Sequence, residues 1–269
     1  MKRLLTIALA AYPVVLVFGF APNPPPTTRP SLRLRETKKD LENLAKELNP
    51  IIGFYDPIGI SNNFFWDLTV DETIGWLRES EIKHGRVAMA ACVGYCVQSF
   101  YTWPFDNTLS GKPFPSTTLS PPEQWDALPL GAKVQILLFI GFLEFYAELS
   151  PPRPGALPHY TKGGIPGKYP SFDGVPHPVP FNLYDPFGFS SKRTKEEKAR
   201  GLLCEINNGR LAMIGIMSVL CESKIPGSIP ALKGLVKPYA GQVMAPFEGT
   251  PFFPASDLGC IFEGLCSSS

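Results

Sequence analysis

Histidine is scarce in this chain, with three among 269 residues. Two of them, His159 and His177, lie in proline-rich stretches. The six cysteines form no Cys-x-x-Cys pair and have no zinc-type spacing with the histidines. A glycine-rich phosphate-binding loop is missing, and so few histidines support no set of nucleophile, base and orienting group. We therefore expect no zinc site and no enzyme activity.

A basic surface is missing as well. Of the 25 Lys and Arg residues, seven lie in residues 1–39, together with one of the 24 Asp and Glu residues. Residues 40–269 therefore carry a net charge of −5. Proteins that bind nucleic acid need clustered Lys and Arg side chains, so we exclude nucleic acid as a partner.

Long apolar runs are few, and the longest uncharged stretch, residues 4–28, lies near the N-terminus. It follows Lys2 and Arg3 and precedes a Pro- and Arg-rich, acid-poor segment. We interpret residues 1–39 as a removable, bipartite targeting segment rather than a membrane span. The Phe-Ala-Pro at residues 20–22 resembles the entry signal of plastids enclosed by extra membranes. The alternative is a plain secretory signal followed by a disordered linker.

The chain contains one nonapeptide twice. Residues 81–89 read Glu-Ile-Lys-His-Gly-Arg-Val-Ala-Met, and residues 205–213 read Glu-Ile-Asn-Asn-Gly-Arg-Leu-Ala-Met, with six of nine positions identical. A second pair, Tyr-Asp-Pro-Ile-Gly-Ile-Ser at 55–61 and Tyr-Asp-Pro-Phe-Gly-Phe-Ser at 184–190, occurs in the same order. Two matches in the same order indicate an internal duplication rather than chance convergence of two amphipathic helices.

Apolar runs between proline and glycine clusters predict three helices, at about residues 71–101, 129–149 and 194–224, joined by long Pro- and Gly-rich loops. The uncharged stretch at residues 87–105 begins in the first helix and ends just beyond it, and it is close to the length of a membrane span. The runs of the first and third helices have no regular polar face. We predict an all-α membrane protein with one domain, residues 40–269, and three transmembrane helices. The alternative is a soluble helical protein.

Small residues in the first and third helices suit close packing of membrane helices. They are Gly85, Ala88, Gly94, Gly209, Ala212 and Gly215.

Each copy of the nonapeptide contains a glutamate and an arginine. Arg86 lies five residues after Glu81, about 140° around the helix, and is poorly placed to pair with it. If the first and third helices cross about a pseudo-twofold axis, Arg86 reaches Glu205 and Arg210 reaches Glu81. We predict these crossed ion pairs, because an unpaired charge costs at least ~2.5 kcal/mol at the centre of a membrane.

A neutral, ligand-type side chain follows each glutamate by three residues, His84 in the first copy and Asn208 in the second. Residues three apart share one helix face. A carboxylate neutralised by arginine keeps a free lone pair, as do an imidazole nitrogen and an amide oxygen. Such donors suit a magnesium ion that is already held in a neutral macrocycle and needs one axial ligand.

Together, Glu-x-x-His-x-Arg-x-Ala-Met and Glu-x-x-Asn-Gly-Arg-x-Ala-Met resemble the chlorophyll-binding helices of the light-harvesting complex family. The resemblance covers about residues 50–230. Residues 162–170 and 180–190 are similar to the fucoxanthin/peridinin chlorophyll a/c antenna proteins of red-lineage algae.

This resemblance implies roles for particular residues. The axial chlorophyll ligands would be Glu81, His84, Glu205 and Asn208, together with Glu144 in the second helix. Carotenoid end groups would lie beside Asp56, Pro57, Asp185 and Pro186. Further possible ligands are Gln98, Gln135, Glu148 and Glu222, for which exposure near the membrane surface is the alternative. Glu222 stands where many members of the family have a glutamine.

The implied function is light capture without chemistry. The protein would bind chlorophyll a, chlorophyll c and a fucoxanthin- or peridinin-like carotenoid in a plastid thylakoid membrane. Its partners would be a photosystem core, neighbouring antenna proteins and thylakoid lipids. One alternative is a photoprotective quencher of the same family. Another is a small transporter that moves protons through Glu81, Glu144 and Glu205.

Overall fold

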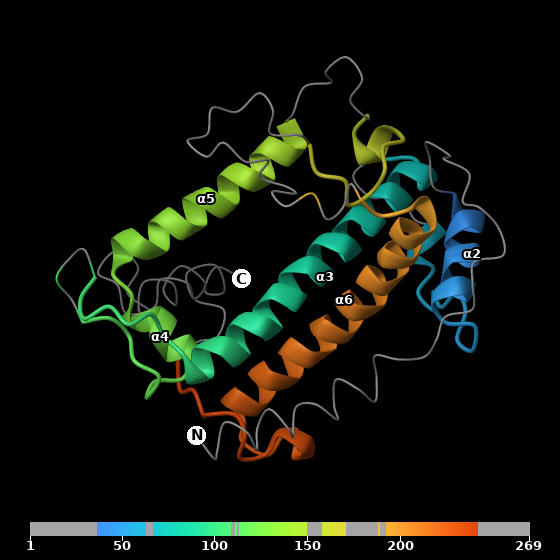
Figure 1. Ribbon diagram of the computed structural model, residues 1–269. Coiled ribbons are helices and arrows are strands. Elements are labelled where there is room, and N and C mark those ends of the chain that lie inside the picture. Colours follow the sequence, from blue (N-terminus) through green and yellow to red (C-terminus); the bar gives the residue numbers. More distant parts are fainter. Residues whose placement is uncertain are drawn as a thin grey trace, which may run out of the picture. The chain divides into compact units, whose positions relative to one another are not determined.

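The computed structural model describes residues 37–62, 67–108, 111, 113–149, 158–170, 188 and 192–241. Within these ranges the chain forms helices and no strand (Figure 1). The helices are α2 (Lys38–Leu48), α3 (Val70–Phe100), α4 (Pro121–Ala127), α5 (Leu130–Leu149) and α6 (Lys195–Lys224). Three short 3-10 turns are η1 (Ile60–Asn62), η2 (Tyr160–Lys162) and η3 (Pro230–Leu232).

The three ranges expected from the sequence are occupied by α3, α5 and α6. The sequence analysis did not anticipate α2 and α4. Because α2 begins at Lys38, the expected end of the targeting segment at residue 39 falls inside the first turn of this helix. Residues 1–36, Asp185 and Pro186 lie outside the described residues.

Short capping sequences determine where several helices begin. In α2, the Asp40 N–H donates to Thr37 Oγ1 at 3.4 Å, and the Thr37 N–H donates to Asp40 Oδ2 at 3.0 Å. The pairs that begin α3 and α6 in the same way are Thr69–Glu72 and Thr194–Glu197. Each pair satisfies N–H groups that the helix leaves open, an effect of typically ~1 kcal/mol.

The described chain forms two compact units. One unit contains α2, the first parts of α3 and α6, the last turn of α5 and residues 158–170. Here α2 packs on α6 through a buried cluster of Leu48, Leu203 and Ile206, with Leu44 at its edge (Figure 1). Asn207 Nδ2 also donates to the Leu48 carbonyl at 3.4 Å.

The other unit contains the second parts of α3 and α6, α4, most of α5 and the segment after α6. Tyr239 is buried and holds this segment in place. Its N–H donates to the Ser223 carbonyl at 2.8 Å, and its hydroxyl donates to Asp126 Oδ2 at 2.7 Å. The end of α6 is thereby fixed to α4.

Large apolar side chains are exposed along α3, α5 and α6. Examples are Val93, Leu138, Phe139, Phe145, Ile214 and Met217. By length and composition, α5 is the one helix among the described residues that could cross a membrane, and 6 % of its most apolar window is buried. The core helix of a soluble protein would be mostly buried, whereas α5 is exposed along this window.

Candidate functional site

The two copies of the nonapeptide meet at their glycines. A Cβ added to Gly85 would lie 3.0 Å from Gly209 Cα, and one added to Gly209 would lie 2.9 Å from Gly85 Cα. Any side chain at either position would therefore push α3 and α6 apart. At Gly94, an added Cβ would meet no described atom within 4 Å. The packing role predicted for Gly94 is wrong, because crossing helices touch closely only over a short stretch.

Two ion pairs flank the glycine contact. Arg86 Nε donates to Glu205 Oε1 at 2.6 Å, and Arg210 Nε donates to Glu81 Oε1 at 2.6 Å. The structure thus brings these four residues together as two pairs, each joining one copy to the other. The contacts are reciprocal, because the arginine of each copy pairs with the glutamate of the other copy.

The two pairs differ in their surroundings. Glu81 also accepts a hydrogen bond through Oε2 from Arg78, a buried arginine one turn earlier on the same helix. Among the described residues, Glu205 has no cation besides Arg86. Glu81 is therefore shared by two cations, whereas Glu205 depends on one.

Arg86 also holds a loop against α3. Its Nη1 donates to the Gly167 carbonyl at 2.7 Å, while the Gly167 N–H donates to Glu79 Oε2 at 2.5 Å. Gly167 has φ 76°, and a Cβ there would lie 2.9 Å from Ile82 Cγ2. This position therefore requires glycine. The sequence could not predict this contact, because the loop has no part in the repeat.

His84 presents one nitrogen to its surroundings. Its Nδ1 lies 2.7 Å from the Ser80 carbonyl oxygen. A carbonyl only accepts, so Nδ1 carries the proton and Nε2 keeps its lone pair. The side chain is exposed. A backbone hydrogen bond that fixes one ring nitrogen and leaves the other open is the usual arrangement of a metal-binding histidine.

The second copy also offers free donor atoms. Asn208 is exposed, and its amide has no partner among the described residues. Its neighbour Asn207 instead bonds to the Leu48 carbonyl. Arg86 contacts Oε1 of Glu205, and Glu205 Oε2 has no partner in the described part of the chain. Asn208 and Glu205 can therefore each give one lone pair to a ligand.

On α5, Glu144 and Glu148 share the ammonium group of Lys83. Lys83 Nζ lies 2.9 Å from Glu144 Oε2 and 3.0 Å from Glu148 Oε1. Glu148 also accepts hydrogen bonds from His159 Nε2 at 3.0 Å and from the Tyr160 hydroxyl at 3.0 Å. Burial and the Glu148 carboxylate raise the pKa of the Tyr160 hydroxyl, which keeps it a donor. The sequence analysis missed the role of Lys83.

Glu222 has a structural role in the turn that follows α6. Its Oε1 accepts the Gly227 N–H at 2.8 Å, and its Oε2 accepts the Ile229 N–H at 2.8 Å. The residue is 2 % exposed. A ligand role does not fit this placement, because a macrocycle cannot reach a carboxylate buried under backbone donors. Gln98 and Gln135 are exposed, with no side-chain partner among the described residues.

Asp56 holds the first Tyr-Asp-Pro loop together. Its carboxylate accepts the N–H groups of Ile60 and Ser61, both at 2.9 Å, and so caps η1. Pro57 is exposed beside it. In the second loop Gly188 has φ 67°, matching the 70° of Gly59 in the first. The repeated sequence therefore encodes the same left-handed glycine in both loops.

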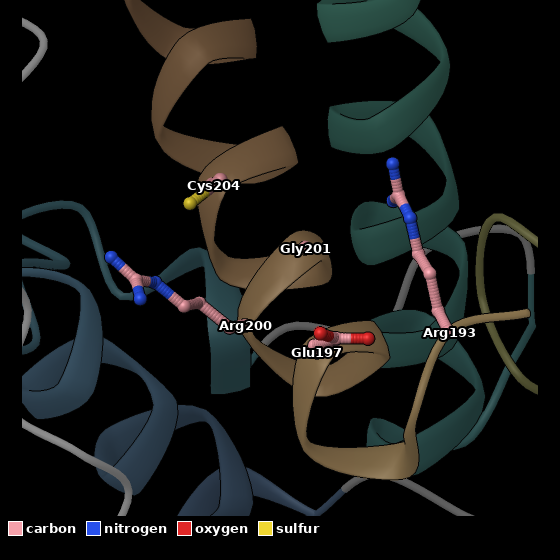
Figure 2. Close-up of a pocket in the computed structure, with 5 residues that line it drawn as sticks. All are labelled: Arg193, Glu197, Arg200, Gly201 and Cys204. Atoms are coloured by element: carbon pink, nitrogen blue, oxygen red, sulfur yellow. The ribbon is translucent and has the colours of Figure 1, made fainter. Parts of the chain in front are cut away.

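An open pocket lies at the start of α6 (Figure 2). It is lined by Arg193, Glu197, Arg200, Gly201 and Cys204. The two arginines are exposed and extend in different directions (Figure 2). None of the predicted ligands lines this pocket, and we assign no function to it.

No group of three or more His, Cys, Asp and Glu side chains within the described ranges is placed to hold a metal ion. The donors described above are single and spaced along the helices. They suit a metal that needs one protein ligand rather than a bare ion in a cage.

Sequence comparisons identify related proteins. The sequence profile described as Chlorophyll A-B binding protein matches residues 40–224. The fucoxanthin-chlorophyll a-c binding protein, chloroplastic, of Chattonella marina var. antiqua is 31 % identical over 207 residues, covering 74 % of this chain and 75 % of the relative. Protein F of the same name from Phaeodactylum tricornutum is 31 % identical over 67 % of this chain and 78 % of its own length. Protein B from Macrocystis pyrifera is 28 % identical over 69 % and 74 %.

Proposed function

The chain belongs to the Chlorophyll A-B binding protein family, and from this we infer that it is a light-harvesting antenna protein. It binds chlorophyll a, chlorophyll c and fucoxanthin, the pigments named for its relatives. It captures light and passes on the excitation energy. The names of those relatives describe pigment binding, and we propose that this chain carries no catalytic site.

The free donor atoms on exposed helix surfaces carry the assignment of the pigment sites. We propose that His84 Nε2, the Asn208 amide oxygen, Glu205 Oε2 and Glu144 Oε1 each ligate one chlorophyll magnesium. His84 and Asn208 are neutral, and Glu205 and Glu144 each pair with a cation, which suits a magnesium inside a neutral macrocycle. Bound chlorophyll supplies the absorption, and the protein fixes the separation and angle of the pigments.

Three other residues complete this assignment. Glu81 remains a proposed ligand, because each of its oxygens keeps a lone pair after accepting from Arg78 and Arg210. Gln98 and Gln135 stay possible ligands, since their amides are exposed. The carotenoid contacts of Asp56, Pro57, Asp185 and Pro186 also remain proposals.

We propose that α3, α5 and α6 span a plastid thylakoid membrane, with α3 and α6 crossed about a pseudo-twofold axis through Gly85 and Gly209. The exposed apolar side chains of these helices support this placement. The targeting segment would end before Thr37, because removal of residues 37–39 would destroy the cap of α2. A photosystem core, neighbouring antenna proteins and thylakoid lipids are the proposed partners.

Pigment extraction from the purified protein tests this function. We expect chlorophyll a, chlorophyll c and fucoxanthin, and we expect chlorophyll a emission when the other two pigments are excited. Efficient emission separates harvesting from a quenching role, in which the emission would be short-lived. A folded, monodisperse but colourless protein would refute the antenna function.

The two adjacent asparagines of the second copy test the ligand assignment. Asn208→Val should lose the chlorophyll held at this position, because valine has no donor atom. Asn207→Val should keep it and lose only a long hydrogen bond to α2. Chlorophyll per chain, measured in both variants after purification, decides the matter. Equal losses from the two variants would show that Asn208 is not the ligand.

A further inference from the structure

We propose that Lys83 is a positioning residue that makes Glu144 the pigment ligand of α5, while His159 and Tyr160 keep Glu148 from this role. The proposal rests on the function proposed above, because it concerns which carboxylate holds a chlorophyll. It starts from a charge cluster in which one ammonium group faces three carboxylates. Lys83 Nζ lies 2.9 Å from Glu144, 3.0 Å from Glu148 and 3.9 Å from Glu79.

Lys83 is the cation that contacts both carboxylates of α5. The nearby guanidinium group of Arg86 donates to Glu205 and to the Gly167 carbonyl. Within the described residues, no other Lys or Arg side chain forms an ion pair with Glu144 or Glu148. A carboxylate without a cation is costly near lipid. Lys83 therefore links α3 to α5 as the two arginines link α3 to α6.

Hydrogen bonding separates the two carboxylates. Both oxygens of Glu148 are used, because Oε1 accepts from Lys83 and Tyr160 while Oε2 accepts from His159 and Tyr160. Glu144 uses Oε2 alone, for Lys83. Its Oε1 has no partner among the described residues, and its side chain is 56 % exposed. Glu144 thus keeps an open donor atom while its other oxygen pairs with Lys83.

Glu144 lines a cleft that combines charged and apolar side chains. Its charged residues include Glu79, Arg86 and Lys168, and Val87, Ala147, Tyr169 and Pro170 give it apolar surface. Lys83 and Glu148 also line the cleft. A macrocycle held at Glu144 Oε1 would therefore have apolar surface next to its metal ligand. Lys83 would direct the other oxygen of Glu144 away from it.

The repeat supports a special role for position 83. Its counterpart in the second copy is Asn207, which bonds to the Leu48 carbonyl of α2. Lys83 instead bonds to α5. The same position of the two nonapeptides therefore contacts α5 in the first copy and α2 in the second. The residue type at this position matches the groups on the contacted helix. A lysine is found where that neighbour carries carboxylates.

Charge replacement at position 83 tests the proposal. In the full chain refolded with extracted pigments, Lys83→Met should weaken chlorophyll binding at Glu144 by about 10-fold or more, the usual effect of removing a group that orients a metal ligand. Lys83→Arg should restore it. Lys162→Met is the control. It removes an exposed lysine of η2, the turn that also contains Tyr160, and should have no effect on chlorophyll binding. The readouts are the number of chlorophylls per chain and the difference in circular dichroism between wild type and each variant.

Removing each carboxylate keeps the test decisive if Lys83→Met fails to fold. Glu144→Leu should lose the same circular-dichroism band of bound chlorophyll as Lys83→Met. Glu148→Leu should keep this band. The proposal is overturned if Lys83→Met keeps the band, if Lys83→Arg does not restore it, or if Glu148→Leu loses it. A wild-type chain without chlorophyll would refute the antenna function instead.

Discussion

Arg86→Leu should destabilise the pigment-bound protein by about 1.5–3 kcal/mol, the usual contribution of hydrogen bonds to charged groups, because the Arg86–Glu205 pair is only partly buried. Glu205 would keep no cation among the described residues, and the Gly167 carbonyl would lose its donor. Arg210→Leu should cost less, because Arg78 still contacts Glu81. Thermal unfolding followed by the circular dichroism of the bound chlorophyll measures both variants.

A second substitution identifies the partner of each arginine. Glu205→Gln should restore part of the stability lost in Arg86→Leu, because it removes the charge left unpaired. Glu81→Gln should restore none of it. The opposite pattern of rescue would mean that the pairs do not run between the two copies. Equal losses from Arg86→Leu and Arg210→Leu would contradict the part assigned to Arg78.

Gly209→Ala should lower the stability by about 1–3 kcal/mol, the typical cost of overpacking a tight contact. The new Cβ would lie 2.9 Å from Gly85 Cα, so α3 and α6 must separate and both ion pairs must lengthen. Gly94→Ala is the matched control on α3, since its Cβ would meet no described atom within 4 Å.

The control should raise stability by up to ~1 kcal/mol, because alanine favours the helix over glycine. The yield of pigmented monomer and its melting temperature compare the two glycine variants. If Gly209→Ala melted at the same temperature as Gly94→Ala, the close backbone contact would not be part of the folded protein.

The helix crossing could be predicted from the sequence because both partners of each contact lie in the repeat. The angle between Glu81 and Arg86 on one helix excludes a pair within that helix and points to the other copy. The spacing of three between Glu81 and His84 likewise places them on one face. Local geometry and a duplicated motif suffice for contacts of this kind.

Other contacts were hidden because their partners lie outside the repeat. Lys83 meets Glu144, 61 residues away, and the sequence does not indicate which charged residues of two different helices become neighbours. Glu222 was expected from the sequence as a possible ligand, yet its carboxylate caps a turn through Gly227 and Ile229. Helix α2 was missed because its start lies in a basic segment interpreted as targeting sequence.

The reciprocal contacts between the nonapeptides also limit which substitutions each copy can accept by itself. Gly85 touches Gly209, so a mutation in either half alters a surface that both halves share. Lys83 and Asn207 face different helices, so each can change without any response from the other half. Substitutions that change a contact with a third helix should therefore be tolerated at such outward positions. At the glycine contact, a substitution in one copy also disturbs the other copy.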